Sequence, residues 1–278
     1  MNLIKSQKSK LKVTRTFLTK GACSHTYFYI LNKEFGYNKP QEEQALDPLA
    51  GGIVQQGYQC GMIWGASMAV AAEALRRTQD LNKAIGLSIK ASQYILESFK
   101  KHSSSIECEE ITSCDWSNKW SMAKFFISGK MVGCFKLASK WAPEAIQAAH
   151  EALALDSSDL PGKCMSCSTE VLKKMGATDE HMVMVAGFAG GLGLSGSGCG
   201  ALAASIWKNI LELLKTNSWK YTLNDPVTEG IIQKFYSLTD YKMECKEISG
   251  KSFTTVSEHS EFIENGGCSQ LIEGLSGK

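Results

Sequence analysis

The chain repeats one pattern of cysteine and glycine, and this internal repeat constrains its fold more than any other feature of the sequence. Two glycine-rich segments, residues 49–61 (LAGGIVQQGYQCG) and 188–200 (FAGGLGLSGSGCG), align without a gap. A Cys-Ser pair precedes each segment, and Glu-Cys-x-Glu-Ile and Gly-Cys-x-x-Leu follow each in the same order. We therefore predict a tandem duplication with a basic N-terminal arm over residues 1–20, a first repeat over 21–156 and a second repeat over 157–278.

The repeat carries eight of the ten cysteines. Each half holds four in the same order: Cys23, Cys60, Cys108 and Cys134, then Cys167, Cys199, Cys245 and Cys268. Core packing does not require cysteine at matched positions, so a shared set of metal ligands in each half explains the match better. Cys114 and Cys164 lie off the repeat, and Cys164 is near enough to Cys167 in the sequence to serve the second site as a spare thiol.

Apolar residues recur at helical spacing through most of both halves, whereas no alternating run exceeds a few residues. The pattern predicts an all-α fold, a duplicated helical bundle with glycine-rich loops. The clearest helices run over residues 80–101, with Asp80 as N-cap, and from Pro226 onward, with Asp225 as N-cap. Further helices are predicted after each glycine-rich segment and over residues 116–141 and 143–155.

The glycine-rich loops place Cys60 and Cys199 at helix starts. The unpaired N–H groups and the positive dipole end of a helix favour a thiolate and should lower the pKa of such a cysteine. Glycine adds N–H groups that no side chain obstructs, and these suit an anion such as a thiolate or a cluster sulfide. We therefore expect the loop glycines to contact a bound cofactor: Gly51, Gly52, Gly57, Gly61, Gly190, Gly191, Gly196 and Gly200. No strand precedes either loop, which argues against a dinucleotide site.

Composition excludes several classes of function. The chain has 30 Lys and Arg against 28 Asp and Glu, a net charge of +2 that gives little support to nucleic-acid binding. The two stretches without charged residues, 48–72 and 181–207, are each interrupted by glycine with serine or glutamine, so no membrane span is expected. The N-terminus lacks the apolar core of a secretion signal. We expect a cytoplasmic protein, whose thiols stay reduced.

In its cysteine and glycine motifs the chain resembles the C_GCAxxG_C_C family of redox-active proteins, which is named after its cysteine pattern. The resembling segments are CSTEVL from Cys167, GFAGGLGLSGSGCGALAAS around Cys199, CKEI from Cys245 and GGCSQLI around Cys268. Residues 198–203 read GCGALA where the family has GCAxxG, and the first half departs further, with glutamine and tryptophan in place of the two glycines. The resemblance implies two fused family units, and iron–sulfur ligation in a related domain implies a cluster.

Three functions stay open after these observations. Four thiolates in each half satisfy a [4Fe–4S] or [2Fe–2S] cluster, which makes an iron–sulfur electron-transfer protein with a redox partner protein the leading hypothesis. The first alternative is thiol–disulfide chemistry without a cofactor, for which Cys164-x-x-Cys167 is the best feature. The second is structural zinc in Cys₄ sites. The histidines show no metal-binding or catalytic spacing, so no catalytic residue and no enzymatic reaction is assigned, and a homodimer remains an option.

Overall fold

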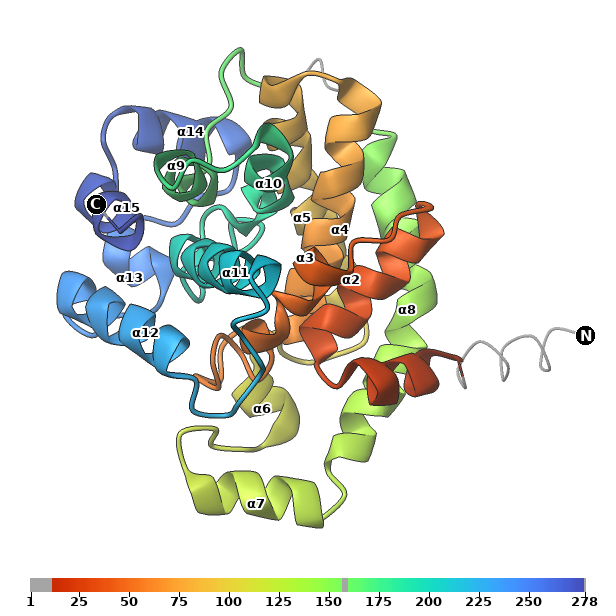
Figure 1. Ribbon diagram of the computed structural model, residues 1–278. Helices are drawn as coiled ribbons and strands as arrows, with labels where there is room; N and C mark the ends of the chain where they lie inside the picture. The colour runs from red at the N-terminus through yellow and green to blue at the C-terminus, as the bar shows by residue number, and fades with distance from the viewer. Residues whose placement is uncertain (1–11, 157–159, 278) are drawn as a thin grey trace, which may run out of the picture.

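The computed structural model describes residues 12–156 and 160–277, and these residues form helices and no strand (Figure 1). The prediction of an all-α fold is therefore confirmed. Residues 1–11 of the predicted basic arm and the predicted boundary at residue 157 lie outside the described residues, whereas residues 12–20 are helical.

In the first half the helices are α2 (Cys23–Glu34), α3 (Pro40–Gln44), α4 (Gly61–Thr78), α5 (Leu81–Lys100), α6 (Cys108–Thr112), α7 (Lys119–Ile127) and α8 (Met131–Leu153). In the second half they are α9 (Cys167–Lys174), α10 (Asp179–Met184), α11 (Gly200–Lys215), α12 (Pro226–Thr239), α13 (Cys245–Ser249), α14 (Val256–Glu264) and α15 (Ser269–Leu275). Two short 3₁₀ helices, η1 (Asp47–Leu49) and η3 (Ala186–Phe188), precede the glycine-rich loops.

Several predicted helices are confirmed by their caps. The carboxylate of Asp80 accepts the N–H of Lys83 at the start of α5, and that of Asp225 accepts the N–H of Thr228 at the start of α12. Both contacts satisfy a backbone donor that the first turn leaves without a helical partner. Helices α4 and α11 begin directly after Cys60, as predicted, and after its counterpart in the second half.

The helix boundaries predicted between residues 116 and 155 are wrong. The chain breaks at Gly129, whose φ of +71° is open to glycine without strain, and α8 then runs unbroken through Pro143. Proline inside a helix removes one hydrogen bond, but α8 buries an alanine-rich face against α5 that holds it together. The proline was therefore a weaker helix breaker than the sequence suggested.

The two halves share one hydrophobic core. Helix α4 packs against α2 and α5, while α11 packs against α9 and α12, and α10 joins the two groups by packing on α4 (Figure 1). Trp64 of α4 meets Phe188 of η3 edge to face with ring centroids 4.7 Å apart. Across the same core, the indole N–H of Trp207 donates to the carbonyl of Glu42 at 3.0 Å. No helix among the described residues is long and apolar enough to cross a membrane.

Candidate cysteine sites

The four cysteines of the first half line one cavity of about 460 Å³. They come from four helices that are far apart in the sequence: Cys23 is the first residue of α2, Cys60 is the N-cap of α4, Cys108 is the first residue of α6 and Cys134 lies in the first turn of α8. The fold thus gathers four thiols around a single space, and we call this set the first cysteine set.

The four cysteines of the second half line a second cavity, which measures only about 20 Å³. Their places on the helices correspond closely to those of the first set: Cys167 is the first residue of α9, Cys199 is the N-cap of α11, Cys245 is the first residue of α13 and Cys268 is the N-cap of α15. We call these the second cysteine set. The two sets therefore differ in the space around them more than in the way the chain positions them.

The same backbone contacts hold the middle two cysteines of each set together. In the first set, the backbone N–H of Cys60 donates to a carbonyl just before Cys108, and the N–H of Cys108 donates to a carbonyl just before Cys60, both at 2.7 Å. In the second set, Cys199 and Cys245 make the same exchange at 3.0 and 2.7 Å. Each pair of segments also forms an isolated antiparallel bridge, Gln59 with Glu107 and Gly198 with Glu244. A bridge of this kind fixes two thiols from separate helices at one end of the bundle.

Two of the predicted cofactor-binding glycines touch thiols through their backbone. The N–H of Gly51 is a hydrogen-bond donor to Cys23, and the N–H of Gly190 has the same place beside Cys167. Gly61 is a third, because a Cβ built on it would lie 2.5 Å from the Cys23 Sγ. Gly61 must be glycine for the start of α4 to approach this sulfur, whereas Gly51 and Gly190 have positive φ values of +73° and +60° that favour glycine.

The other loop glycines have structural reasons that do not involve a cofactor. A Cβ on Gly200 would lie 1.8 Å from the carbonyl oxygen of Phe188, and one on Gly52 would lie 2.3 Å from the backbone of Tyr58. The remaining three have positive φ values and lie against the segments that follow the loops: Gly57, Gly191 and Gly196. They let each loop close on itself and on its neighbour.

The expectation that the helix-start position lowers the pKa values of Cys60 and Cys199 is wrong, because both values are raised. Within the two sets only Cys23 has a lowered pKa. Its pKa lies below the ordinary value because the Cys60 thiol donates a hydrogen bond to it, with further help from nearby N–H groups. That same bond, followed by burial, raises the pKa of Cys60. Burial is the main cause that raises the pKa of the others, to about 12 for Cys134 and Cys268, and also upward for Cys108, Cys167, Cys199 and Cys245. Desolvation of the thiolate therefore outweighs the helix dipole at most of these positions.

The two cysteines off the repeat lie in different surroundings. Cys164 lies against α5, where its Sγ is the nearest atom to a Cβ built on Gly86, and it lines neither cavity. The structure therefore does not bring this predicted spare thiol to the second set. Cys114 is buried beside the first set, since its charge would raise the pKa values of Cys108 and Cys134.

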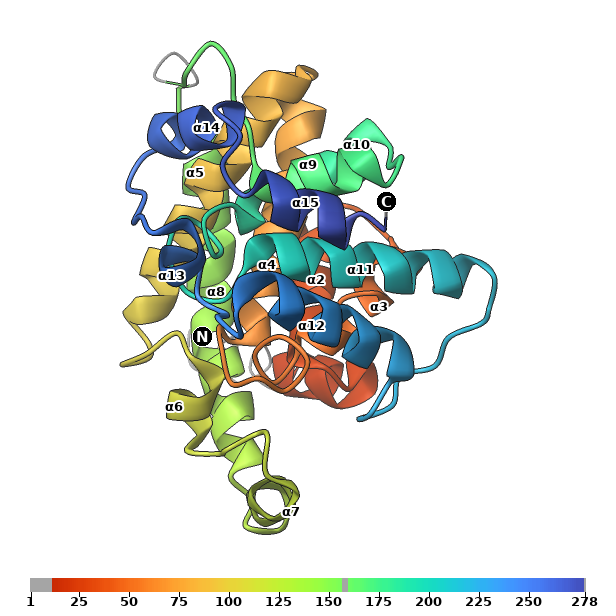
Figure 2. The ribbon, with the colours of Figure 1, turned by 90° about the vertical axis from the view of Figure 1, so that its left-hand side faces the viewer.

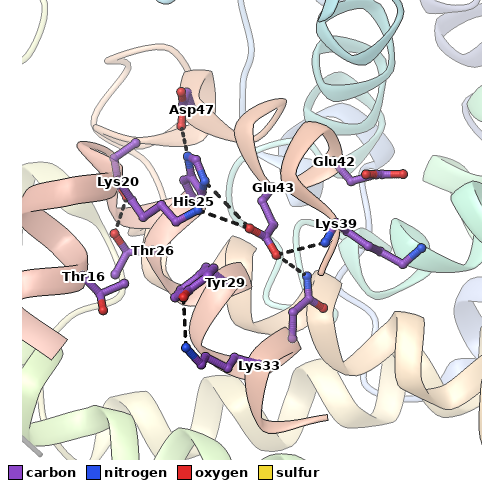
Figure 3. Close-up of polar contacts among 12 residues, drawn as sticks. Thr16, Lys20, His25, Thr26, Tyr29, Lys33, Lys39, Glu42, Glu43 and Asp47 are labelled. Carbon is purple, nitrogen blue, oxygen red and sulfur yellow. Dashed lines mark hydrogen bonds and ion pairs between the residues drawn. The ribbon is translucent and has the colours of Figure 1, made fainter. Parts of the chain in front are cut away.

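A buried polar network borders the first cavity (Figure 3). His25 Nδ1 lies 3.0 Å from the Oδ1 of Asp47, which lines the cavity, and His25 Nε2 lies 4.0 Å from a carboxylate oxygen of Glu43. The Nζ of Lys20 lies 3.5 Å from the same Glu43 oxygen. In the second half the repeat places threonine opposite His25 and alanine opposite Asp47, so this network belongs to the first site alone.

Several residues that line the two cavities were not predicted from the sequence. Tyr221 and Leu223 come from the loop between α11 and α12, yet they line the first cavity. Phe253 and His259 line the second. No motif marks these side chains, and only the packing of distant segments brings them to the thiols.

Burial of His259 makes a testable difference to acid stability. Desolvation lowers the pKa of this histidine to about 4, from 6.5. Between these two values the unfolded chain binds more protons than the folded chain, so the free energy of unfolding falls as the pH falls through this window. We expect His259→Gln to lose less stability than wild type between pH 7 and pH 4.5, by about 2–3 kcal/mol, in urea unfolding at both pH values.

The matched control for this experiment is His150→Gln, because His150 is half exposed at the surface. It should show the acid sensitivity of wild type. Equal acid sensitivity in His259→Gln and wild type would contradict the assignment.

No group of three or more His, Cys, Asp or Glu side chains within residues 12–156 and 160–277 is close enough together to hold one metal ion. The first set instead surrounds a space.

Comparisons with known proteins bear on the first half. Residues 22–146 match the family described as "Putative redox-active protein (C_GCAxxG_C_C)". The match contains the whole first cysteine set, although the sequence motifs closest to the family pattern lie in the second half. No curated protein matches the chain. No solved structure matches it either.

Proposed function

Because this chain belongs through residues 22–146 to the C_GCAxxG_C_C family of redox-active proteins, we propose that it is an electron-transfer protein that holds an iron–sulfur cluster on its first cysteine set. The observation that carries the proposal is the convergence of four thiols from four helices on one cavity of about 460 Å³. When bound, such a cluster supplies a one-electron redox couple.

The electrostatics of the first set support a cationic cluster core. Burial of a thiolate without a compensating charge is costly, which is why most of these thiols have raised pKa values. Iron would supply the missing charge, and the N–H groups of Gly51 and of the helix starts are donors for ligand or cluster sulfur. These residues bind and orient the group, while the aromatic side chains of the cavity limit the access of water.

The second cysteine set has less room. Its cavity of about 20 Å³ accommodates about one water molecule, and His259, Phe262 and Ile263 of α14 line it closely. We therefore propose that the first set binds a cluster and that the second set remains as free thiols. The cysteine pattern would then have been duplicated before the two halves came to differ in cluster binding.

A second candidate function has one observation in its favour. Cys23 and Cys60 are hydrogen-bonded to each other, and Cys23 alone has a lowered pKa. A thiolate beside a thiol is the arrangement that thiol–disulfide exchange requires. In this alternative the pair cycles between dithiol and disulfide without metal.

Anaerobic purification followed by iron, acid-labile sulfide and zinc analysis separates these functions. We expect a brown protein with visible charge-transfer absorption and up to about four iron atoms per chain. A colourless protein with tightly bound zinc would replace the cluster by a structural zinc site. A colourless, metal-free protein in which oxidation protects Cys23 and Cys60 together from alkylation would support thiol–disulfide exchange instead.

A further inference from the structure

The first cavity keeps space that the second half fills with its own side chains. In the second half, α14 packs against α5, and its residues His259 and Phe262 line the small cavity. In the first half, the helix at the corresponding place is α7, which buries only Phe125. Both views show α7 at the far end of the molecule, apart from the helices of the second half (Figure 1, Figure 2). The difference between about 460 and 20 Å³ follows from this difference in packing.

Aromatic side chains line the additional space: Phe17, Trp116, Phe125, Phe126 and Tyr221. The rings of Trp116 and Phe125 are 5.1 Å apart at 57°, and those of Phe125 and Phe126 are 5.3 Å apart at 78°. Phe125 is buried, whereas Trp116 is half-buried, so the Trp116 ring is the one of this pair that can stack on a third ring. The volume of the cavity lies within the range of about 300–1,000 Å³ that is usual for small-molecule sites.

Polar groups in this space are few. The hydroxyl of Tyr221 accepts a hydrogen bond from the Nε2 of Gln55 at 3.0 Å, and its own O–H has no acceptor within the part of the chain that the structure describes. Asp47 places a carboxyl group in the same cavity, and Lys20 is engaged with Glu43. The Tyr221 O–H is therefore a donor that a ligand can engage, beside a carboxylate that repels anions.

We propose that the first cavity binds a flat, neutral, fused-ring aromatic molecule that carries a carbonyl group, beside the first cysteine set, and that the Tyr221 hydroxyl donates to this carbonyl. The half-buried ring of Trp116 supplies the stacking surface, and the buried Phe125 supports it from behind. The second half lacks such a site because α14 occupies the space. This binding site goes beyond the cluster proposal and requires no iron, so the two can fail independently.

Coumarin, a neutral bicyclic carbonyl compound, is a suitable probe in isothermal titration calorimetry with the full chain. We expect saturable binding of one molecule per chain. Tyr221→Phe should weaken this binding about 2- to 12-fold, the loss of one net hydrogen bond, while circular dichroism stays unchanged. Tyr241→Phe, at an 80% exposed position, is the matched control and should bind as wild type does.

Octahydrocoumarin keeps the carbonyl and the ring connectivity of coumarin but is not flat, and it should bind about 2- to 12-fold more weakly because it cannot stack. The proposal is overturned if coumarin does not bind wild type, if the saturated compound binds equally well, or if Tyr221→Phe binds coumarin with wild-type affinity. Iron analysis of the same samples reports separately on the cluster.

Discussion

We expect Cys60→Ser to lose the iron of the anaerobically purified protein, whereas Cys199→Ser should retain it. Cys60 is the N-cap of α4 and lines the roomy first cavity, so its loss removes one of four ligands from the proposed cluster. Cys199 has the corresponding place on α11, but its cavity of about 20 Å³ leaves no room for a cluster. The measurement is iron and acid-labile sulfide per chain, with wild type at up to about four iron atoms and Cys60→Ser near zero.

Cys164→Ser is the matched control, because Cys164 is buried to the same degree as Cys60 and lines neither cavity. It should keep the iron content of wild type. If Cys199→Ser loses iron as Cys60→Ser does, the division between the two sets is wrong, and both halves contribute to metal binding. If Cys60→Ser retains its iron, Cys60 is not a ligand and the first cysteine set is not the metal site.

We expect Gly200→Ala to destabilise the fold by about 3 kcal/mol, the upper end of the usual cost of overpacking. The added Cβ would lie 1.8 Å from the carbonyl oxygen of Phe188, and a backbone atom cannot move aside as the end of a flexible side chain can. The start of α11 must then shift away from the loop that precedes it. Urea unfolding followed by circular dichroism measures the loss.

Gly230→Ala provides the opposite case on the same kind of element. Gly230 lies in the exposed interior of α12, and a Cβ built on it meets nothing within 4 Å. Alanine there should stabilise the protein by about 0.5–1 kcal/mol through helix propensity. A Gly200→Ala variant as stable as wild type would show that η3 and α11 are not in the close contact that the structure describes.

Local signals in the sequence were sufficient for much of the fold. The caps Asp80 and Asp225 predicted helix starts because each satisfies backbone donors within its own first turn, an interaction that needs no distant partner. The break at Gly129 could not be predicted in the same way. Its position depends on how α8 packs against the core, and Pro143 competed with it as a local signal.

The candidate site was likewise predictable only in part from the sequence. The repeat predicts which cysteines belong to the same half, and the structure brings each group of four to one cavity, while their role as ligands stays a prediction. The pKa values of these thiols could not be predicted from helix position, because burial acts against the helix dipole and depends on the whole surrounding fold. Tyr221 reaches the first cavity from the other half and carries no local signal.

Gln59 stands where the family pattern has glycine, and the structure gives a reason for this departure. Its amide donates to the carbonyls of Gly191 and Gly198 at 2.7 and 3.2 Å, and a Cβ on Gly198 would lie 2.6 Å from its Oε1. The two repeat counterparts therefore face each other, and the glutamine of one half fits only because the other half has glycine. Such a fit belongs to a contact between distant segments, which no single segment can encode.

By itself, the sequence determined the helical class, the principal caps and the ordered sets of cysteines, because periodicity, capping and repetition act over short stretches of chain. The tertiary structure alone decided that α14 covers the thiols of the second half while α7 leaves those of the first half beside an open aromatic cavity. The physical reason is that the space around a buried thiol is set by the side chains that pack over it. In this fold those side chains come from helices whose place depends on the packing of the whole core.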